Sequence, residues 1–168
     1  NTDDIDLIRA VQTHWQQINS GSVYAYFENR YSKNQNNARD VYLLGRLQES
    51  PIDKVKFGRK AISLDKNWAY GYRLVLATYG ELFSGRSDSE MTQKLAEELK
   101  SDEQYFKTLI KLVPNETYPL EFLYQYQVFN KKFRKAIETL DKRRAINPNS
   151  VSDRDYAICY AKLGDFKK

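Results

Sequence analysis

Apolar residues recur every three or four positions along most of the chain, as they do on one face of an α-helix. The first predicted helix runs from a candidate cap at Thr2 through Ile18, and residues 19–21 end it. Its apolar stripe consists of Ile5, Ile8, Val11, Trp15 and Ile18. The same rhythm continues over residues 23–31, and the polar run 32–37 leads to the next segment. We therefore expect a helical hairpin at the N-terminus.

Seven further segments have the same helical rhythm, with turn residues between them. They cover residues 38–49, 52–64, 68–83, 87–113, 118–129, 133–146 and 150–164. Pro51 follows a turn at Ser50 and suits the first position of a helix. Gly45 lies inside a predicted helix, where glycine costs about 1 kcal/mol relative to alanine. We therefore expect another helix to cross closely at Gly45.

The segment 87–113 is longer than its neighbours and has two interpretations. Ser87 and Glu90 have the spacing of a capping box that would start a helix, and Ser101 and Gln104 could form a second box that divides it in two. We favour one continuous helix, because its stripe alternates by three and four positions. The stripe consists of Leu95, Leu99, Asp102, Phe106, Leu109 and Val113.

Two prolines, Pro114 and Pro148, stand 34 positions apart, and an asparagine follows each of them. That interval is typical of repeated helix pairs in which each pair contacts only its neighbours. Lys66 holds the equivalent position 48 residues before Pro114, so this repeat is 14 residues longer. The chain is therefore predicted to form one domain of stacked hairpins over residues 1–168, as part of a longer protein.

Aromatic, small and turn residues near the C-terminus form a recognisable set. One half-repeat is carried by Tyr156, Ala157, Tyr160, Gly164, Asp165 and Phe166, and the preceding return helix by Phe133, Ala136, Leu140, Ile146 and Pro148. Upstream, the same pattern is met by Leu44, Gly45, Ala61, Leu64 and Asp65. These residues resemble the tetratricopeptide repeat (TPR) family. The resemblance implies an all-α fold, a right-handed α-solenoid of about four to five TPR-like helical hairpins.

In that family the outgoing helices line a concave surface, so the resemblance nominates side chains on their outer faces for contact with a partner. The predicted peptide-binding groove consists of Arg39, Tyr42, Arg46, Tyr70, Arg73, Tyr124, Arg154 and Lys162. Tyrosine supplies rigid contact area, and arginine can bind a carboxylate through two hydrogen bonds. We therefore expect an extended peptide ligand that is acidic or bound by its C-terminus. The alternative is that these side chains only coat a solvated helix face.

Some family members bind chaperone tails through lysine, arginine and asparagine side chains, and this chain departs from that pattern at Ala77 and Ile158. The leading hypothesis is a non-enzymatic scaffold for protein–protein interaction. The first alternative is a regulatory or substrate-recruiting module attached to an enzyme. A solenoid that binds nucleic acid ranks last, because Glu49 and Glu81 interrupt the proposed wall.

Charge and reactive side chains narrow the possibilities further. Residues 131–168 carry 11 Lys and Arg against 5 Asp and Glu, which we interpret as a solvated basic helix face. His14 is the only histidine and Cys159 the only cysteine, so no metal set or nucleophile–base pair is evident. We expect His14 at a helix boundary and Cys159 packed as a small apolar residue. No catalytic residue, cofactor or metal is predicted.

The two ends of the chain raise separate expectations. No apolar stretch approaches the roughly 20 residues that a membrane span needs, so we expect a soluble protein. The sequence begins at Asn1 without methionine, which suggests a trimmed or mature form and leaves a cytoplasmic or an exported location open. The last predicted helix would leave Tyr156 and Tyr160 uncovered, so we expect either further chain after Lys168 or self-association through the C-terminal helix.

Overall fold

The computed structural model describes residues 4–84 and 90–165. Every regular element in these two ranges is helical, as the sequence predicts. The elements are α1 (Ile5–Ile18), α2 (Ser20–Lys33), α3 (Ala38–Arg46), α4 (Pro51–Leu64), α5 (Ala69–Ser84), α6 (Glu90–Leu112), α7 (Tyr118–Phe129), α8 (Phe133–Ile146), the short 3₁₀ turn η1 (Pro148–Ser150) and α9 (Asp153–Leu163). The predicted cap at Thr2 and the capping box that would start at Ser87 lie outside the described residues.

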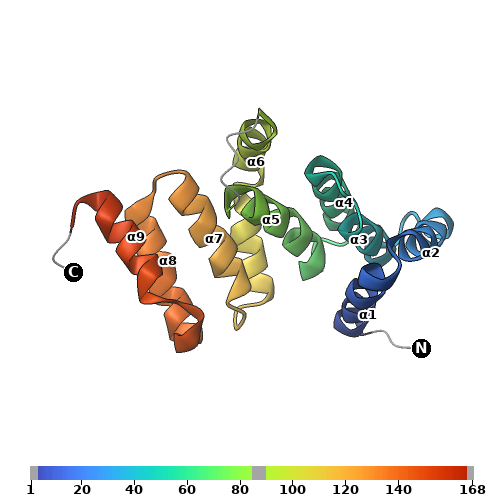
Figure 1. The fold of residues 1–168 in the computed structure, drawn as a ribbon, viewed down its shortest axis with the longest axis horizontal. Helices are drawn as coiled ribbons and strands as arrows, with labels where there is room; N and C mark the ends of the chain where they lie inside the picture. Colours follow the sequence, from blue (N-terminus) through green and yellow to red (C-terminus); the bar gives the residue numbers. More distant parts are fainter. Residues whose placement is uncertain (1–3, 85–89, 166–168) are drawn as a thin grey trace. The chain divides into compact units, whose positions relative to one another are not determined.

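The helices belong to two compact units, Asn1–Val75 and Leu76–Lys168, and the division lies within α5. In the first unit α1 packs against α2, α2 against α3, and α3 against α4. In the second unit α6 packs against α7, α7 against α8, and α8 against α9 (Figure 1). In these pairs each helix contacts the next one along the chain, which is how helical hairpins build a repeat array. Among the described helices, none is long and apolar enough to cross a membrane.

Local signals set several helix ends at the predicted positions. α7 and α8 begin and end where the sequence indicates, and the side chain of Ser50 caps α4 with Pro51 in the first turn. α9 begins with a capping box between Ser152 and Asp155 that the sequence analysis missed. It ends at Leu163, and Gly164 caps it with a φ of 74°, the left-handed conformation that glycine adopts without strain.

Two predicted boundaries near the N-terminus are wrong. Residues 20 and 21 belong to α2, because Asn19 alone separates α1 from α2 and its side chain caps α2 by accepting from the Ser22 N–H at 2.9 Å. α3 ends at Arg46 and does not reach Glu49. Its last turn is tight, because the Leu47 N–H donates to the carbonyl of Leu44, three residues earlier.

The buried side of α1 also differs from the predicted stripe. Val11 and Ile18 are exposed by 55% and 71%, whereas Gln12 is only 1% exposed. The other members of the stripe do pack against the core of the first unit: Ile5, Ile8 and Trp15. The true inward face therefore has a polar residue at its centre.

The close crossing expected at Gly45 is confirmed. A Cβ atom at this position would lie 2.5 Å from Cβ of Phe57 in α4 and 2.8 Å from Cδ2 of Leu74 in α5. A second close approach joins α4 to α5, because a Cβ at Gly58 would lie 2.6 Å from Val75 and 3.2 Å from the carbonyl oxygen of Gly71. Glycine thus lets the backbones of the first unit approach closely, and any larger residue would have to push its neighbours away.

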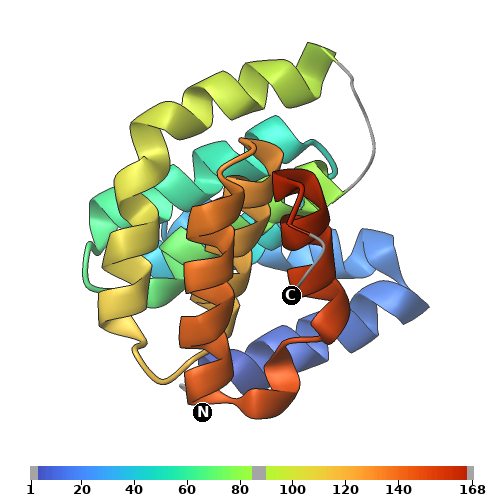
Figure 2. The same cartoon turned by 90° about the vertical axis from the view of Figure 1, so that its left-hand side faces the viewer.

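The long segment after residue 87 forms one continuous helix, α6, over the 23 residues that the structure describes as helical. Figure 2 shows that this helix bends along its length without breaking. The Ser101 hydroxyl donates to the carbonyl of Glu98 within the helix and does not start a new one. The predicted stripe is buried at five positions, Leu95, Leu99, Asp102, Phe106 and Leu109. The additional length of this repeat is therefore packed into the core of the second unit.

Candidate functional site

Three arginine side chains gather in the first unit, one from each of α1, α3 and α5. They are Arg9, Arg46 and Arg73, and all three guanidinium groups act electrostatically on the phenol of Tyr42. Burial lowers the pKa of Arg46, Tyr42 counteracts this, and the positive charges of Arg9 and Arg73 lower that pKa further. The three cations are thus close enough to repel one another, which favours the binding of an anionic group between them.

Arg46 is held in a fixed position by α1. Its Nη1 donates to Oε1 of Gln12 at 2.5 Å and to the carbonyl of Arg9 at 3.3 Å, and its Nη2 donates to Oγ1 of Thr13 at 3.0 Å. These bonds spread over both terminal nitrogens of the guanidinium group, so its plane is set before any ligand arrives. Such preorganisation lowers the entropy cost of binding.

Gln12 links α1 to α3 inside the core. Its Nε2 donates to the carbonyl of Leu43 at 2.7 Å, so its Oε1 is the atom free to accept from Arg46. The Leu43 carbonyl is available because the tight last turn of α3 sends the Leu47 N–H to Leu44 instead. A polar residue at the centre of the buried face is therefore satisfied on both sides of its amide.

Asp6 of α1 contacts Tyr70 of α5, 64 residues further along the chain. Its Oδ2 accepts a hydrogen bond from the Tyr70 hydroxyl, and its Oδ1 accepts from Nη1 of Arg9, whose guanidinium lies 5.4 Å from the centre of the Tyr70 ring. The bond from Tyr70 lowers the pKa of Asp6, and Arg9 and Arg73 add to this effect against the cost of burial. Burial first, and then the bond to Asp6, raise the pKa of Tyr70 to about 12.

Tyr42 lies beneath these groups. It is 2% exposed, and its ring packs edge-on against Trp68 at 5.3 Å and against Tyr70 at 5.6 Å between ring centres. Burial raises the pKa of its hydroxyl, so the side chain stays neutral. Tyr42 therefore packs against the ring of Tyr70 from inside the core and presents almost no surface to a ligand.

The polar side of α1 borders a depression of about 390 Å³ in the first unit. Its lining consists of Asp6, Arg9, Ala10, Thr13, His14, Gln17 and Arg46. His14 is an exposed residue within α1, so the prediction that it lies at a helix boundary is wrong. The described lining of this depression contains two arginines, Arg9 and Arg46, and one carboxylate, Asp6, so its net charge is positive.

Arg39, at the start of α3, lies apart from this cluster. It borders a second depression of about 330 Å³ together with the turn residues that precede α3 and α5. The remaining lining residues are Asn36, Asn37, Ala38, Leu64, Asp65 and Trp68. The structure thus brings four of the predicted groove residues together, Tyr42, Arg46, Tyr70 and Arg73, and places Arg39 at another surface.

The other predicted groove residues belong to the second unit. Tyr124 of α7 is half-buried, and its hydroxyl interacts with the thiol of Cys159 in α9. Burial, followed by Cys159 and Asp155, raises the pKa of Tyr124. Arg154 and Lys162 are exposed on α9. Cys159 is fully buried, as predicted, and burial raises the pKa of its thiol.

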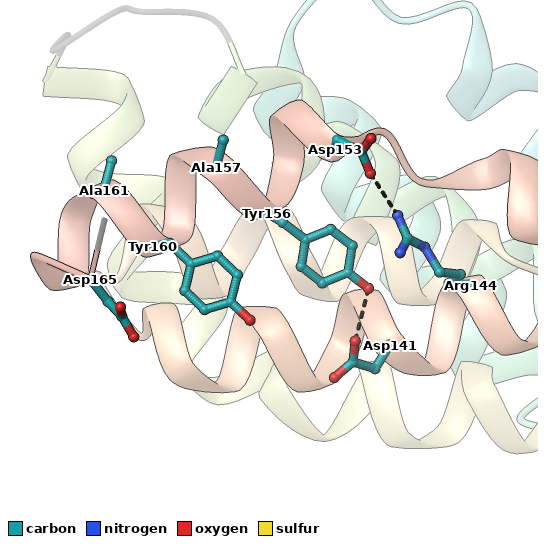
Figure 3. Close-up of a pocket in the computed structure, with 8 residues that line it drawn as sticks. All are labelled: Asp141, Arg144, Asp153, Tyr156, Ala157, Tyr160, Ala161 and Asp165. Carbon is teal, nitrogen blue, oxygen red and sulfur yellow. Dashed lines mark hydrogen bonds and ion pairs between the residues drawn. The ribbon is translucent and has the colours of Figure 1, made fainter. Parts of the chain in front are cut away.

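A depression of about 790 Å³ lies beside α8 and α9 in the second unit (Figure 3). The Tyr156 hydroxyl donates to Asp141 at 2.8 Å, and Arg144 lies 4.7 Å from the Tyr156 ring centre while it pairs with Asp153 at 3.0 Å. Burial and the Asp141 bond raise the pKa of Tyr156 to about 12. Figure 3 shows the rings of Tyr156 and Tyr160 on one side of α9. Both are half-buried, and the expectation that further chain or self-association covers them stays a prediction.

Sequence reasoning missed the contribution of α1 to the arginine cluster. Asp6, Arg9 and Thr13 follow one another at spacings of three and four, which is the only local signal that they share a helix face. Their partners in α3 and α5 lie 33 to 64 residues away.

Among the described residues, no group of three His, Cys, Asp or Glu side chains could hold a metal ion.

Known structures with the same arrangement of helices support the TPR-type fold. The structure of MamA from Desulfovibrio magneticus RS-1, residues 41 to the end, is 13% identical to this chain with a TM-score of 0.73, and the match covers 99% of this chain and 89% of that one. A MamA double mutant gives the same identity and TM-score and covers 99% and 88%. TTC0263, a thermophilic TPR protein of Thermus thermophilus, is 16% identical with a TM-score of 0.63 and covers 94% and 81%.

At this level of identity the likeness concerns the fold alone. The chain has the all-α fold of stacked TPR-type hairpins that its resemblance to the family predicts. No family model matches the sequence, and no curated protein matches it.

Proposed function

We propose that this chain is a protein-interaction scaffold whose first unit binds an acidic peptide. The observation that carries the proposal is the gathering of Arg9, Arg46 and Arg73 from three successive outgoing helices. A TPR-type fold supports the general role, because its hairpins present an extended surface and few enclosed cavities. The acidic nature of the ligand follows from the charge of that surface.

The arginine cluster suits a carboxylate better than it suits a neutral group. Guanidinium groups form charge-assisted hydrogen bonds with carboxylates that are roughly twice as strong as neutral ones. Arg46 is already oriented by Gln12 and Thr13, so part of the ordering cost is met before binding. Tyr70 adds a hydroxyl donor and a ring face beside the same position.

The predicted groove residues take different roles in this proposal. Arg46, Tyr70 and Arg73 contact the ligand, and Tyr42 holds Tyr70 in place. Arg39 and the second-unit residues Tyr124, Arg154 and Lys162 stay candidates for additional contacts.

Replacing Arg73 by alanine should weaken the binding of a fluorescein-labelled hexaglutamate peptide by about tenfold or more. A hydrogen bond to a charged group contributes about 1.5–3 kcal/mol, and each 1.4 kcal/mol changes the dissociation constant tenfold. Arg73 is preferred to Arg46 because the loss of Arg46 would also leave the buried Gln12 without its partner. Fluorescence anisotropy at two salt concentrations measures the effect, and circular dichroism checks that the fold is retained.

Arg134→Ala is the matched control, because Arg134 is an exposed arginine on α8 in the second unit and its loss changes the net charge by the same amount. We expect this control to bind hexaglutamate as the wild type does, and neither protein to bind hexaglutamine. Equal weakening by both substitutions would contradict a specific site. Binding of single-stranded DNA that is tighter than hexaglutamate binding and falls steeply with salt would favour the nucleic-acid alternative.

A further inference from the structure

The carboxylate of Asp6 already occupies a position between the arginine cluster and Tyr70. We propose that Asp6 is a built-in stand-in for the ligand's carboxylate and that an acidic peptide must displace it from Tyr70 and Arg9 in order to bind. This inference rests on the proposed function and adds a means of regulation to the same site.

The contacts of Asp6 are those that a bound acidic side chain would make. One oxygen accepts from the Tyr70 hydroxyl, and the other accepts from the Arg9 guanidinium. A carboxylate between a hydroxyl donor and a guanidinium has both oxygens satisfied by charge-assisted or directed hydrogen bonds. The contact also joins α1 to α5, and while it lasts the Tyr70 hydroxyl donates to Asp6 and not to a ligand.

The exposure of Asp6 allows it to leave, in contrast to Asp40 of α3, which pairs with Arg30 of α2. The side chain of Asp6 is 61% exposed, so it can rotate into water, whereas that of Arg9 is 18% exposed and is left to pair with the ligand's carboxylate. The side chain of Asp40 is 4% exposed and pairs with Arg30 at 2.7 Å, so breaking that pair would strand a buried carboxylate. Asp40 is structural, and Asp6 can be exchanged.

The charge of Asp6 also opposes the ligand before any displacement occurs. Arg9 and Arg73 both act on Asp6 electrostatically, so this carboxylate neutralises part of the field that would attract an acidic peptide. Removing the charge and removing the side chain should therefore have separable effects. Asparagine removes the charge but can still accept a hydrogen bond from Tyr70, whereas alanine removes both.

The test compares Asp6→Asn and Asp6→Ala with the wild type in binding to fluorescein-labelled hexaglutamate. We expect Asp6→Ala to bind about three- to tenfold more tightly and Asp6→Asn to bind with intermediate affinity. Asp53→Ala is the matched control, because Asp53 also lies in the first turn of a helix of this unit, α4, and pairs with the residue three positions later, Lys56, at 3.1 Å. We expect this control to leave the affinity unchanged.

Three results would overturn the inference while leaving the proposed function intact: equal affinity of Asp6→Ala and the wild type, equal affinity of Asp6→Ala and Asp6→Asn, or equal tightening by Asp53→Ala. If the wild type and Asp6→Ala both fail to bind hexaglutamate, the proposed function itself fails, and the inference fails with it. The Arg73→Ala variant separates these cases, because it removes one cation of the cluster while Asp6 keeps its two hydrogen-bond partners, Tyr70 and Arg9.

A second measurement follows Asp6 directly. Its pKa in the free protein lies below the ordinary value, chiefly because of the bond from Tyr70. Carboxyl NMR of the wild type should show this pKa moving back toward the ordinary value when hexaglutamate saturates the site, since the displaced side chain loses both partners. A pKa that stays low in the presence of bound hexaglutamate would show that Asp6 keeps its contacts, and it would overturn the inference.

Discussion

Replacing Tyr42 by alanine should lower the free energy of unfolding of the first unit by about 3–5 kcal/mol, the usual cost of truncating a large buried aromatic side chain. The ring is 2% exposed and packs against both Trp68 and Tyr70. Urea unfolding followed by tryptophan fluorescence measures the loss selectively, because both tryptophans of the chain, Trp15 and Trp68, belong to this unit.

Tyr42→Phe is the control for this experiment, since it keeps the ring and removes only the hydroxyl. We expect it to cost less than about 1.5 kcal/mol, as volume-conserving changes in a core usually do. The alanine variant should also weaken hexaglutamate binding, because Tyr70 loses the ring on which it rests. A loss of stability below about 1 kcal/mol for Tyr42→Ala would contradict the supporting role of this side chain.

Replacing Leu99 by alanine should lower the free energy of unfolding of the second unit by about 2–5 kcal/mol. Leu99 is fully buried near the middle of α6, the helix that makes this repeat longer than the 34-residue interval. Alanine is the best helix former, so the cost arises from the cavity and not from a weakened helix. Urea unfolding followed by far-UV circular dichroism measures it.

Glu97→Ala is the matched control on the same helix, because Glu97 is exposed and its replacement should change stability by no more than about 0.5 kcal/mol. If Leu99→Ala were as mild as this control, α6 would be an appended helix without a role in the core. The burial of Leu95, Leu99, Phe106 and Leu109 along one side argues for a role in the core.

The helices themselves could largely be predicted from the sequence, because their signals are local. The bounds of α7 and α8 follow from turn residues and from Pro148, and the continuity of α6 follows from the spacing of its stripe. Gly45 predicted a close crossing, because glycine destabilises the interior of a helix unless close packing with a neighbouring helix compensates. Each of these inferences needed only a few neighbouring residues.

The inward face of α1 could not be predicted, because its centre is polar. Periodicity favoured Val11, yet Gln12 lies in the core because it finds partners in Leu43 and Arg46, more than 30 residues away. Hydrophobic spacing assumes that inward residues are apolar, and a satisfied buried amide breaks that assumption.

The candidate site could be predicted only in part, because some of its residues are defined by contacts between distant segments of the chain. Arg46, Tyr70 and Arg73 follow from the rule that outgoing helices carry the contact surface, and the structure brings them together. The burial of Tyr42 and the contribution of Asp6 depend on which side chains meet between α1, α3 and α5. That information is tertiary, and no local pattern contains it.

The single thiol of the chain, Cys159, is fully buried in α9, and burial raises its pKa. An alkylating reagent reacts with the thiolate, so it reaches this sulfur only when α9 separates from the helices that cover it. The rate of alkylation of the unmodified protein therefore reports local opening in the second unit, without any introduced label. The alkylation rate of Cys159 therefore measures how often α9, the helix that carries Tyr156 and Tyr160, separates from its neighbours.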